Sequence, residues 1–168
     1  ISDPTDTITN INDSPIGMVT IVGIAQEDQT LTVKTSTLAD EDGLGTFSYQ
    51  WLADGEIIDG ATSETFTLTQ DEVGKAISVE ASYEDGHETV ETVTSDGTSI
   101  VANVNDPIAG EIYIVGNMVV GEMLAAGVDL ISDEDGIGVL QYQWFADGAE
   151  IEGAQSNEFE VTSEEIGK

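Results

Sequence analysis

The chain of 168 residues contains no cysteine, one histidine and only three lysine or arginine residues. The absence of cysteine excludes disulfides and thiolate metal sites. A folded domain outside the cell would therefore need another kind of stabilising cross-link. His87 has no second group to orient it, which excludes nucleophile–base triads and histidine metal sites. A pair of carboxylates, such as a glycosidase uses, cannot be recognised among 34 acidic residues, because some pair lies at any chosen spacing. We therefore expect no enzymatic activity.

The scarcity of basic residues leaves a formal net charge of −31 at pH 7. A chain this acidic would be disordered if it were poor in apolar residues, but 39% of its residues are hydrophobic and they alternate with polar ones. We predict a folded protein whose field repels nucleic acid and anionic membranes and favours divalent cations or high salt. Nucleic acid is therefore excluded as a partner. No apolar run of membrane-spanning length is present, and we expect no direct membrane insertion.

The sequence repeats itself at an offset of 93 residues, so that segment 20–75 matches segment 113–168 without gaps. About 24 of the 56 aligned positions are identical, and Trp51 and Trp144 are equivalent. The match is densest in segments that read as turns and core, where 40–43, 49–51 and 53–55 recur as 133–136, 142–144 and 146–148. Residues 2–3 and 10–13 match 95–96 and 103–106 at the same offset. We predict a slice of a tandem array, with residues 1–15 as the end of a preceding repeat and its linker, 16–106 as a complete repeat, and 107–168 as a second repeat that lacks its C-terminal strands.

Two-residue alternation of apolar and polar side chains predicts an all-β fold. Ile77, Val79 and Ala81, for example, alternate with serine and glutamate. Asp-Gly turn signals separate the runs, as in a sandwich of short antiparallel strands. The predicted strands of the first repeat are 18–23, 30–36, 46–52, 56–58, 64–69, 76–84 and 88–103, the last one interrupted at Asp96-Gly97. Seven strands in about 90 residues indicate tandem immunoglobulin-like antiparallel β-sandwiches.

Four segments of the first repeat carry a resemblance to a known family. They are Tyr49–Gly55, Ile58–Thr62, Phe66–Thr69 and Val73–Ile77. Together they resemble the bacterial Ig-like repeats found in tandem in giant secreted adhesins, including RTX-type and other surface proteins. Trp51 also resembles the core tryptophan of immunoglobulin domains, although this chain has no cysteine pair for it to pack on. The resemblance implies an extracellular location, secreted or on the bacterial cell surface, and a role in cell adhesion and biofilms.

Acidic loops are the candidate functional feature. In a sandwich of this topology two loops and the incoming linker meet at one end, which would bring Asn12 and Asp13 near Asp40, Asp42 and Asp85. Two carboxylates 4 Å apart repel by about 4 kcal/mol at an effective dielectric constant of about 20, so such a cluster either stays splayed in water or takes up a cation. Calcium suits it because calcium accepts six to eight oxygens in flexible geometry. We expect a weak calcium site.

The linkers 10–15 and 103–107 are similar to the cadherin interdomain linker, in which an Asn-Asp segment holds calcium between domains. By that analogy a second calcium site would use Asn105, Asp106, Asp133 and Asp135, with Asp71 and Glu72 offered from the preceding domain. The same segments are also good turns in their own right, and most of the remaining acidic residues are expected to form a solvated surface.

Three functions are compatible with an acidic, repeated β-sandwich. The first is a structural spacer whose partners are the neighbouring repeats of the same chain, stiffened by calcium. The second is a carbohydrate-binding or other ligand-binding module, for which Phe145 is the candidate exposed aromatic residue. The third is a homophilic adhesion module, which the uniform negative charge disfavours. We favour the spacer because the two copies preserve turns and core while their surfaces vary; any surface glycan would then be bound by other parts of the parent protein.

Overall fold

The structure is a computed structural model that describes residues 6–168, so the predicted match of Ser2-Asp3 to a strand end lies outside the described residues. The chain divides into two compact units, unit 1 (Ile1–Val104) and unit 2 (Asn105–Lys168). Within residues 6–168 the regular elements are β-strands and two short 3-10 helices, which confirms the all-β prediction. None of the helices in this range is long and apolar enough to cross a membrane.

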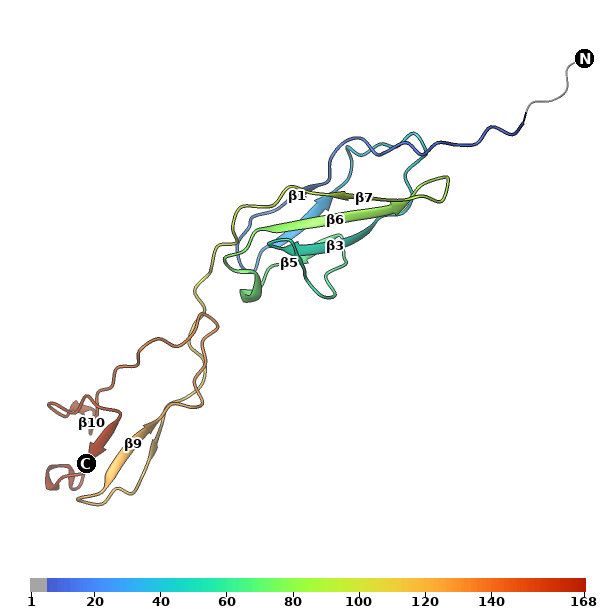
Figure 1. The fold of residues 1–168 in the computed structure, drawn as a ribbon. Coiled ribbons are helices and arrows are strands. Elements are labelled where there is room, and N and C mark those ends of the chain that lie inside the picture. Colours follow the sequence, from blue (N-terminus) through green and yellow to red (C-terminus); the bar gives the residue numbers. More distant parts are fainter. Residues whose placement is uncertain (1–5) are drawn as a thin grey trace, which may run out of the picture. The chain divides into compact units, whose positions relative to one another are not determined.

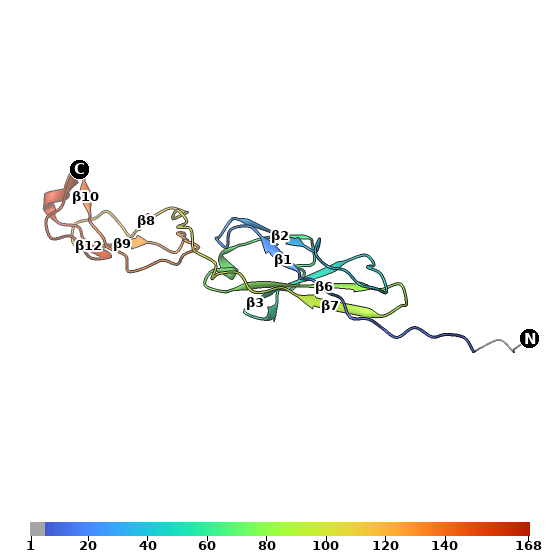
Figure 2. The same cartoon turned by 90° about the horizontal axis from the view of Figure 1, so that it is seen from above.

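Unit 1 is a sandwich of two antiparallel sheets around one core (Figures 1 and 2). A three-stranded sheet has the order β1-β2-β5, and a four-stranded sheet has the order β4-β3-β6-β7. A 3-10 helix, η1 (Gln70–Glu72), follows β5. The strands are β1 (Thr20–Val22), β2 (Thr30–Lys34), β3 (Ser48–Ala53), β4 (Glu56–Ile57), β5 (Thr65–Thr67), β6 (Ile77–Glu84) and β7 (Val90–Thr94).

Alternation places the apolar side chains of β6 in the core, where Ile77, Val79 and Ala81 are fully buried. They lie on the same face of the sheet as Trp51 of the neighbouring strand β3. The indole of Trp51 is also fully buried and stacks on Phe66 with ring centroids 5.6 Å apart. The indole Nε1 donates a hydrogen bond of 2.9 Å to the carbonyl oxygen of Ser63. Because a buried N–H needs an acceptor, this bond fixes the orientation of the largest side chain in the core.

The last predicted strand of unit 1, 88–103, is divided. Strand β7 ends at Thr94, and the remainder contributes isolated bridges, including a parallel one between Gln26 and Ala102. Ser95 explains the break, since its hydroxyl accepts a hydrogen bond of 3.0 Å from the backbone N–H of Val79, in place of a backbone carbonyl. After the break the chain turns back into the core, where Val101 is buried.

Unit 2 contains a three-stranded sheet of order β12-β9-β8 and a two-stranded ribbon, β10-β11. Its local contacts repeat those of unit 1: Nε1 of Trp144 donates a 2.9 Å hydrogen bond to Ser156, and its ring stacks on Phe159 at 5.5 Å. The core is smaller, with Leu124 and Trp144 as its buried hydrophobic residues. The elements are β8 (Tyr113–Val115), β9 (Met123–Gly127), β10 (Phe145–Ala146), β11 (Ala149–Glu150), β12 (Glu158–Glu160) and the 3-10 helix η2 (Ser163–Glu165).

Candidate cation site

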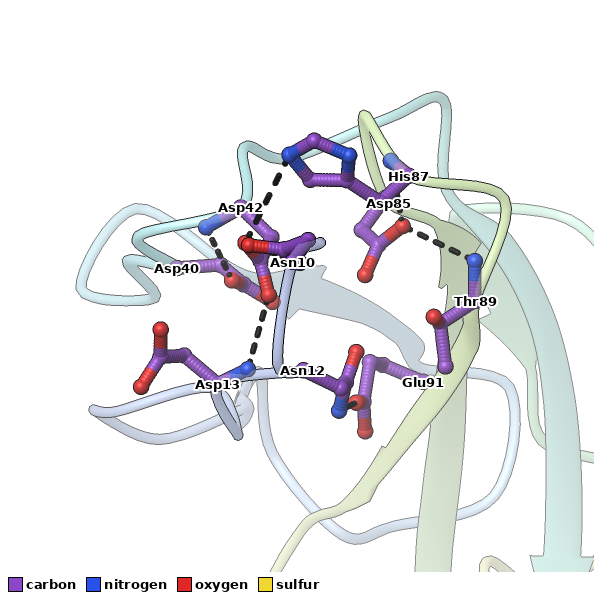
Figure 3. A network of polar contacts seen from close by, with 9 residues as sticks. All are labelled: Asn10, Asn12, Asp13, Asp40, Asp42, Asp85, His87, Thr89 and Glu91. Atoms are coloured by element: carbon purple, nitrogen blue, oxygen red, sulfur yellow. Dashed lines mark hydrogen bonds and ion pairs between the residues drawn. The ribbon is translucent and has the colours of Figure 1, made fainter. Parts of the chain in front are cut away.

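Three segments of unit 1 that are distant in sequence meet at one end of the sandwich (Figure 3). They are the N-terminal segment 10–13, the loop 40–42 that precedes β3, and the loop and strand 85–91 that follow β6. This meeting of loops is the one that the sequence predicts. Glycine permits the close approach: the backbone N–H of Gly86 donates to the carbonyl oxygen of Asp42 at 2.9 Å, and a Cβ atom at position 86 would lie 2.6 Å from that same oxygen.

We call this end of unit 1, formed by segments 10–13, 40–42 and 85–91, the loop end. Asp42 makes contacts with all three of its segments, and its side chain is only 5% exposed. One carboxylate oxygen accepts a hydrogen bond of 2.9 Å from the side-chain amide of Asn10, and the other accepts one of 2.7 Å from the backbone N–H of Asp13. Nε2 of His87 lies 3.8 Å from the same carboxylate, within ion-pair distance if the imidazole is protonated. Asp42 therefore ties the N-terminal segment to the loops through neutral donors.

Asp40 connects the loop that carries Asp42 to strand β6. Its Oδ1 accepts a 2.8 Å hydrogen bond from the backbone N–H of Asp42, and its Oδ2 accepts one from the hydroxyl of Tyr83 on β6. Burial, together with this hydrogen bond and the charge of Asp40, raises the pKa of Tyr83 well above its usual value, so the phenol remains a donor. The predicted ligand Asp40 thus has one oxygen engaged in holding its loop and the other in contact with β6.

Asp85 is a second buried acidic residue of the loop end, at 6% exposed. Its Oδ1 accepts hydrogen bonds from the backbone N–H groups of Thr89, at 2.8 Å, and His87, at 2.7 Å. The Thr89 hydrogen bond is the main cause of the lowered pKa of Asp85, ahead of the opposing effect of desolvation. Its Oδ2 is buried and has no hydrogen-bond partner among residues 6–168. Figure 3 shows this carboxylate directed toward the space between Asn10 and Glu91.

Asn12 and Asp13 take different roles from each other. The Asn12 amide donates a 2.7 Å hydrogen bond to Glu91 on β7, whereas Asp13 contributes its backbone N–H and points its carboxylate away from Asp42 (Figure 3). Sequence reasoning missed both Glu91 and Asn10 as members of the cluster. Alternation on β7 would have placed Glu91 on one face of the strand, but not within reach of a residue 79 positions earlier.

Unit 2 repeats the core of this arrangement at the offset of 93 residues. The backbone N–H of Asp106 donates to Asp135 at 2.9 Å, and that of Asp135 donates to Asp133 at 3.0 Å, as Asp13, Asp42 and Asp40 do in unit 1. The Asn105 amide donates to the carbonyl oxygen of Asp106 at 2.9 Å. Four predicted residues of the second site therefore lie together within unit 2.

Glu72 has a local role that differs from the predicted one. It closes a capping box on η1, in which its Oε2 accepts hydrogen bonds from the backbone N–H and hydroxyl of Thr69 at 2.9 and 2.8 Å. Asp71, the other predicted ligand from this turn, is exposed. In unit 2, Thr162 and Glu165 form an equivalent capping box on η2. The Thr-x-x-Glu spacing of a capping box was present in the sequence and would have identified this role.

Glu27 is a buried acidic residue that sequence reasoning missed, at 3% exposed. Its Oε2 accepts a 2.9 Å hydrogen bond from the backbone N–H of Val104, and its Oε1 lies 2.9 Å from the amide of Gln70, in the orientation that lets the amide donate. Glu27 thus anchors the end of unit 1 next to the linker. The internal repeat hides it, because the equivalent position of the second copy is Val120.

Replacing Glu27 by alanine is expected to lower the free energy of unfolding of unit 1 by about 1–3 kcal/mol, because the Val104 N–H and the Gln70 amide lose their acceptor in a buried place. Glu27→Gln keeps one oxygen acceptor and should cost less. Urea denaturation of the full chain measures both. Equal stability of the alanine variant and the original chain would contradict this role.

Acid should weaken unit 1 through Asp85. Because the folded-state pKa of Asp85 is lowered from 3.8, its carboxylate stabilises the folded state at pH above about 4, and that contribution is lost as the pH falls through the lowered folded-state pKa. In chelator, the melting temperature of unit 1 should therefore fall more steeply below pH 4 in the original chain than in Asp85→Asn. Parallel curves for the two proteins would contradict the assignment.

The chain matches no protein-family model and no curated protein.

Proposed function

We propose that this chain is a structural extender of a large bacterial surface adhesin, extracellular in location, in which calcium fastens each incoming linker to the loop end of its unit. The observation that carries the proposal is the recurrence, at an offset of 93 residues, of one carboxylate arrangement: a linker N–H donates to an aspartate whose own N–H donates to a second aspartate. A feature that recurs at the start of each unit is suited to a role in joining units.

The electrostatics of the loop end in unit 1 favour a cation. Asp40, Asp42, Asp85 and Glu91 gather there, and among residues 6–168 the one ion-pair contact that they receive is from His87. The buried Oδ2 of Asp85 has lost its water without gaining a donor, which is costly unless a cation or a proton neutralises it. The lowered pKa of Asp85 disfavours the proton. Oxygen ligands of this kind suit calcium, which accepts six to eight of them in flexible geometry, and do not suit zinc or copper.

A cation at this place would act as a cross-link. It would connect segment 10–13, the loop 40–42 and residue 85, which otherwise meet through a few hydrogen bonds between neutral donors and carboxylates. Fixing the direction of the linker on each unit reduces the freedom of a string of units, and so increases its reach. The chain contains no cysteine, so a bound ion supplies the staple that disulfides provide in other extracellular domains.

Small-angle scattering of the full chain tests the extender function. We expect the radius of gyration to increase from chelator to about 5 mM calcium, a concentration above the dissociation constants typical of extracellular modules. Asp133→Asn combined with Asp135→Asn should abolish the increase, because it removes the two carboxylates that accept the repeated hydrogen bonds in unit 2. Asp59→Asn combined with Glu150→Gln is the matched control, since both residues are exposed and the change in charge is the same. An increase that persists in the Asp133 and Asp135 variant would refute the mechanism.

Carbohydrate binding is a second candidate function. The observation that favours it is Phe145 on β10, which is 56% exposed and offers a flat apolar surface on which a sugar ring could stack. Glycan-array binding by the full chain that Phe145→Ala abolishes would support this function. Retention of the calcium response in the same variant would separate it from the extender role.

A further inference from the structure

The negative charge of the chain is not uniform over the surface of unit 1. In the sheet β1-β2-β5, Leu31 and Val33 of β2 are buried in the core, so the alternate residues of the three strands face outward. The outward positions hold five threonines, Val22 and Lys34. We call this surface the Lys34 face. Its formal charge is +1 in a chain of net charge −31, so the repulsion that disfavours contact between copies is reduced here.

The equivalent face of unit 2 has the opposite charge. In the sheet β12-β9-β8, Leu124 is buried and its cross-strand partner Phe159 is half-buried, so the alternate residues face outward. They include Tyr113, Glu158 and Glu160, and we call this surface the Tyr113 face. The two glutamates give it a formal charge of −2. The Lys34 face of unit 1 is exposed although the second sheet of that unit is in place, so this side of the sandwich belongs to the surface of the domain.

Tyr113 is held in place on its face by two contacts. Its hydroxyl donates a hydrogen bond to Oδ1 of Asp129, and its ring covers Gly127 of β9, where a Cβ atom would collide with the ring. Glu158 is paired with Ala125 and is therefore a diagonal neighbour of Gly127, within reach of the ring. An ordered aromatic ring beside a carboxylate suits an ammonium group, which gains a cation–π contact and a charge-assisted hydrogen bond.

We propose that the Lys34 face of one chain binds the Tyr113 face of a second copy, with the Lys34 ammonium between the Tyr113 ring and the carboxylate of Glu158. The formal charges of the two faces, +1 and −2, are complementary. Complementary charge orients the encounter, and like charge disfavours contact through the acidic surfaces elsewhere on the two copies. This lateral contact goes beyond the extender function and needs no calcium.

The apolar part of the contact is small. Val22 of the first chain, 55% exposed, would pack against Val115 and Met123 of the second, which are 49% and 50% exposed. Three strands of this length present a face of about 200 Å², whereas a stable interface buries about 800 Å² on each partner. The complex is therefore transient and has to be measured at high concentration.

Cross-linking of the full chain tests the proposal, because a carbodiimide joins an amine to a carboxylate in contact with it and the chain has only three basic side chains. Isotope-labelled and unlabelled chains are mixed at about 1 mM, a concentration at which even weak complexes form, in metal-free buffer. Sodium chloride at about 0.15 M screens the long-range repulsion between the two acidic partners. Between chains, we expect Lys34 to be joined to Glu158 at least about tenfold more often than the exposed Lys75 is.

Charge reversal supplies matched variants. Lys34→Glu and Glu158→Lys each place like charges across the contact, so either variant alone should associate less than the original chain in sedimentation equilibrium at about 1 mM. A mixture of the two variants restores an opposite pair and should associate again. Both residues are exposed, so neither substitution is expected to disturb the fold.

Three outcomes would overturn the proposal. The first is equal cross-linking of Lys34 and Lys75 to Glu158, which would show that the Lys34 face is not preferred. The second is a cross-link between Lys34 and Glu158 that forms only within single chains, which would exclude a second copy as the occupant. The third is a mixture of the charge-reversed variants that associates no more than either variant alone.

Discussion

Replacing Trp51 by alanine is expected to lower the free energy of unfolding of unit 1 by about 3–5 kcal/mol, a large part of the 5–15 kcal/mol typical of a small domain. The indole is fully buried, stacks on Phe66 and lies in one cluster with residues of both sheets. Its removal leaves a cavity where the two sheets meet, and the carbonyl oxygen of Ser63 loses its donor. Protection of the β6 amides from hydrogen exchange measures the loss.

Two variants control this experiment. Trp144→Ala removes the equivalent side chain of unit 2 and should leave the β6 amides protected, since β6 belongs to unit 1. Trp51→Phe keeps an aromatic ring in the core but not the donor, so it should cost less than alanine. If Trp51→Ala and Trp144→Ala have the same effect on β6, the assignment of Trp51 as the centre of the unit 1 core is wrong.

Calcium at about 10 mM is expected to stabilise unit 1 by about 2–3 kcal/mol if its dissociation constant is about 10⁻⁴ M, because a ligand at about 100 times its dissociation constant contributes about 2.7 kcal/mol. Asp85→Asn should remove this stabilisation, since the substituted amide places a donor where the buried, unpartnered Oδ2 now lies. In chelator at neutral pH the same substitution should lower the stability of unit 1, because it removes a carboxylate whose lowered pKa marks it as stabilising the folded state.

The gain in stability from chelator to calcium distinguishes a ligand from a structural residue. A purely structural Asp85 would make Asp85→Asn destabilising by the same amount in chelator and in calcium, whereas loss of a ligand makes the difference between the two proteins larger in calcium. Asp59→Asn, in an exposed turn, is the matched control and should retain the calcium response. Thermal melts of the three proteins in chelator, calcium and magnesium provide the measurement. Equal stabilisation of the original chain and Asp85→Asn by calcium would exclude Asp85 as a ligand.

The proposed calcium staple connects composition to function. A chain with 34 acidic residues and three basic ones cannot neutralise its loops internally, so the loop end of unit 1 uses neutral amide donors for Asp42 and leaves one oxygen of Asp85 without a partner. A divalent ion would complete these interactions, and its removal would loosen the linker. Stiffness of the array would then respond to the calcium concentration of the surroundings.

Several features of the candidate site could be predicted from sequence, and others could not. The meeting of segments 10–13, 40–42 and 85–91 follows from strand order, which alternation and Asp-Gly turns reveal. The contacts of Glu27 and Glu91 depend on residues 77 and 79 positions away, and no local pattern reports such distances. Asp13 illustrates the same limit, because the position of its backbone was predictable and the direction of its carboxylate was not.

The all-β class, the alternating burial of β6 and the equivalence of Trp51 and Trp144 could all be predicted from the order of residues alone. These features depend on a two-residue period and on a repeat, both of which are properties of the chain read locally. Three other features became visible only in the folded chain: which oxygens have donors, which acidic side chain is buried without a hydrogen-bond partner for one oxygen among residues 6–168, and the division of the last strand of unit 1 at Ser95. Those outcomes depend on the packing of segments far apart in sequence, where side-chain direction and hydrogen-bond partners are set by neighbours that no local pattern specifies.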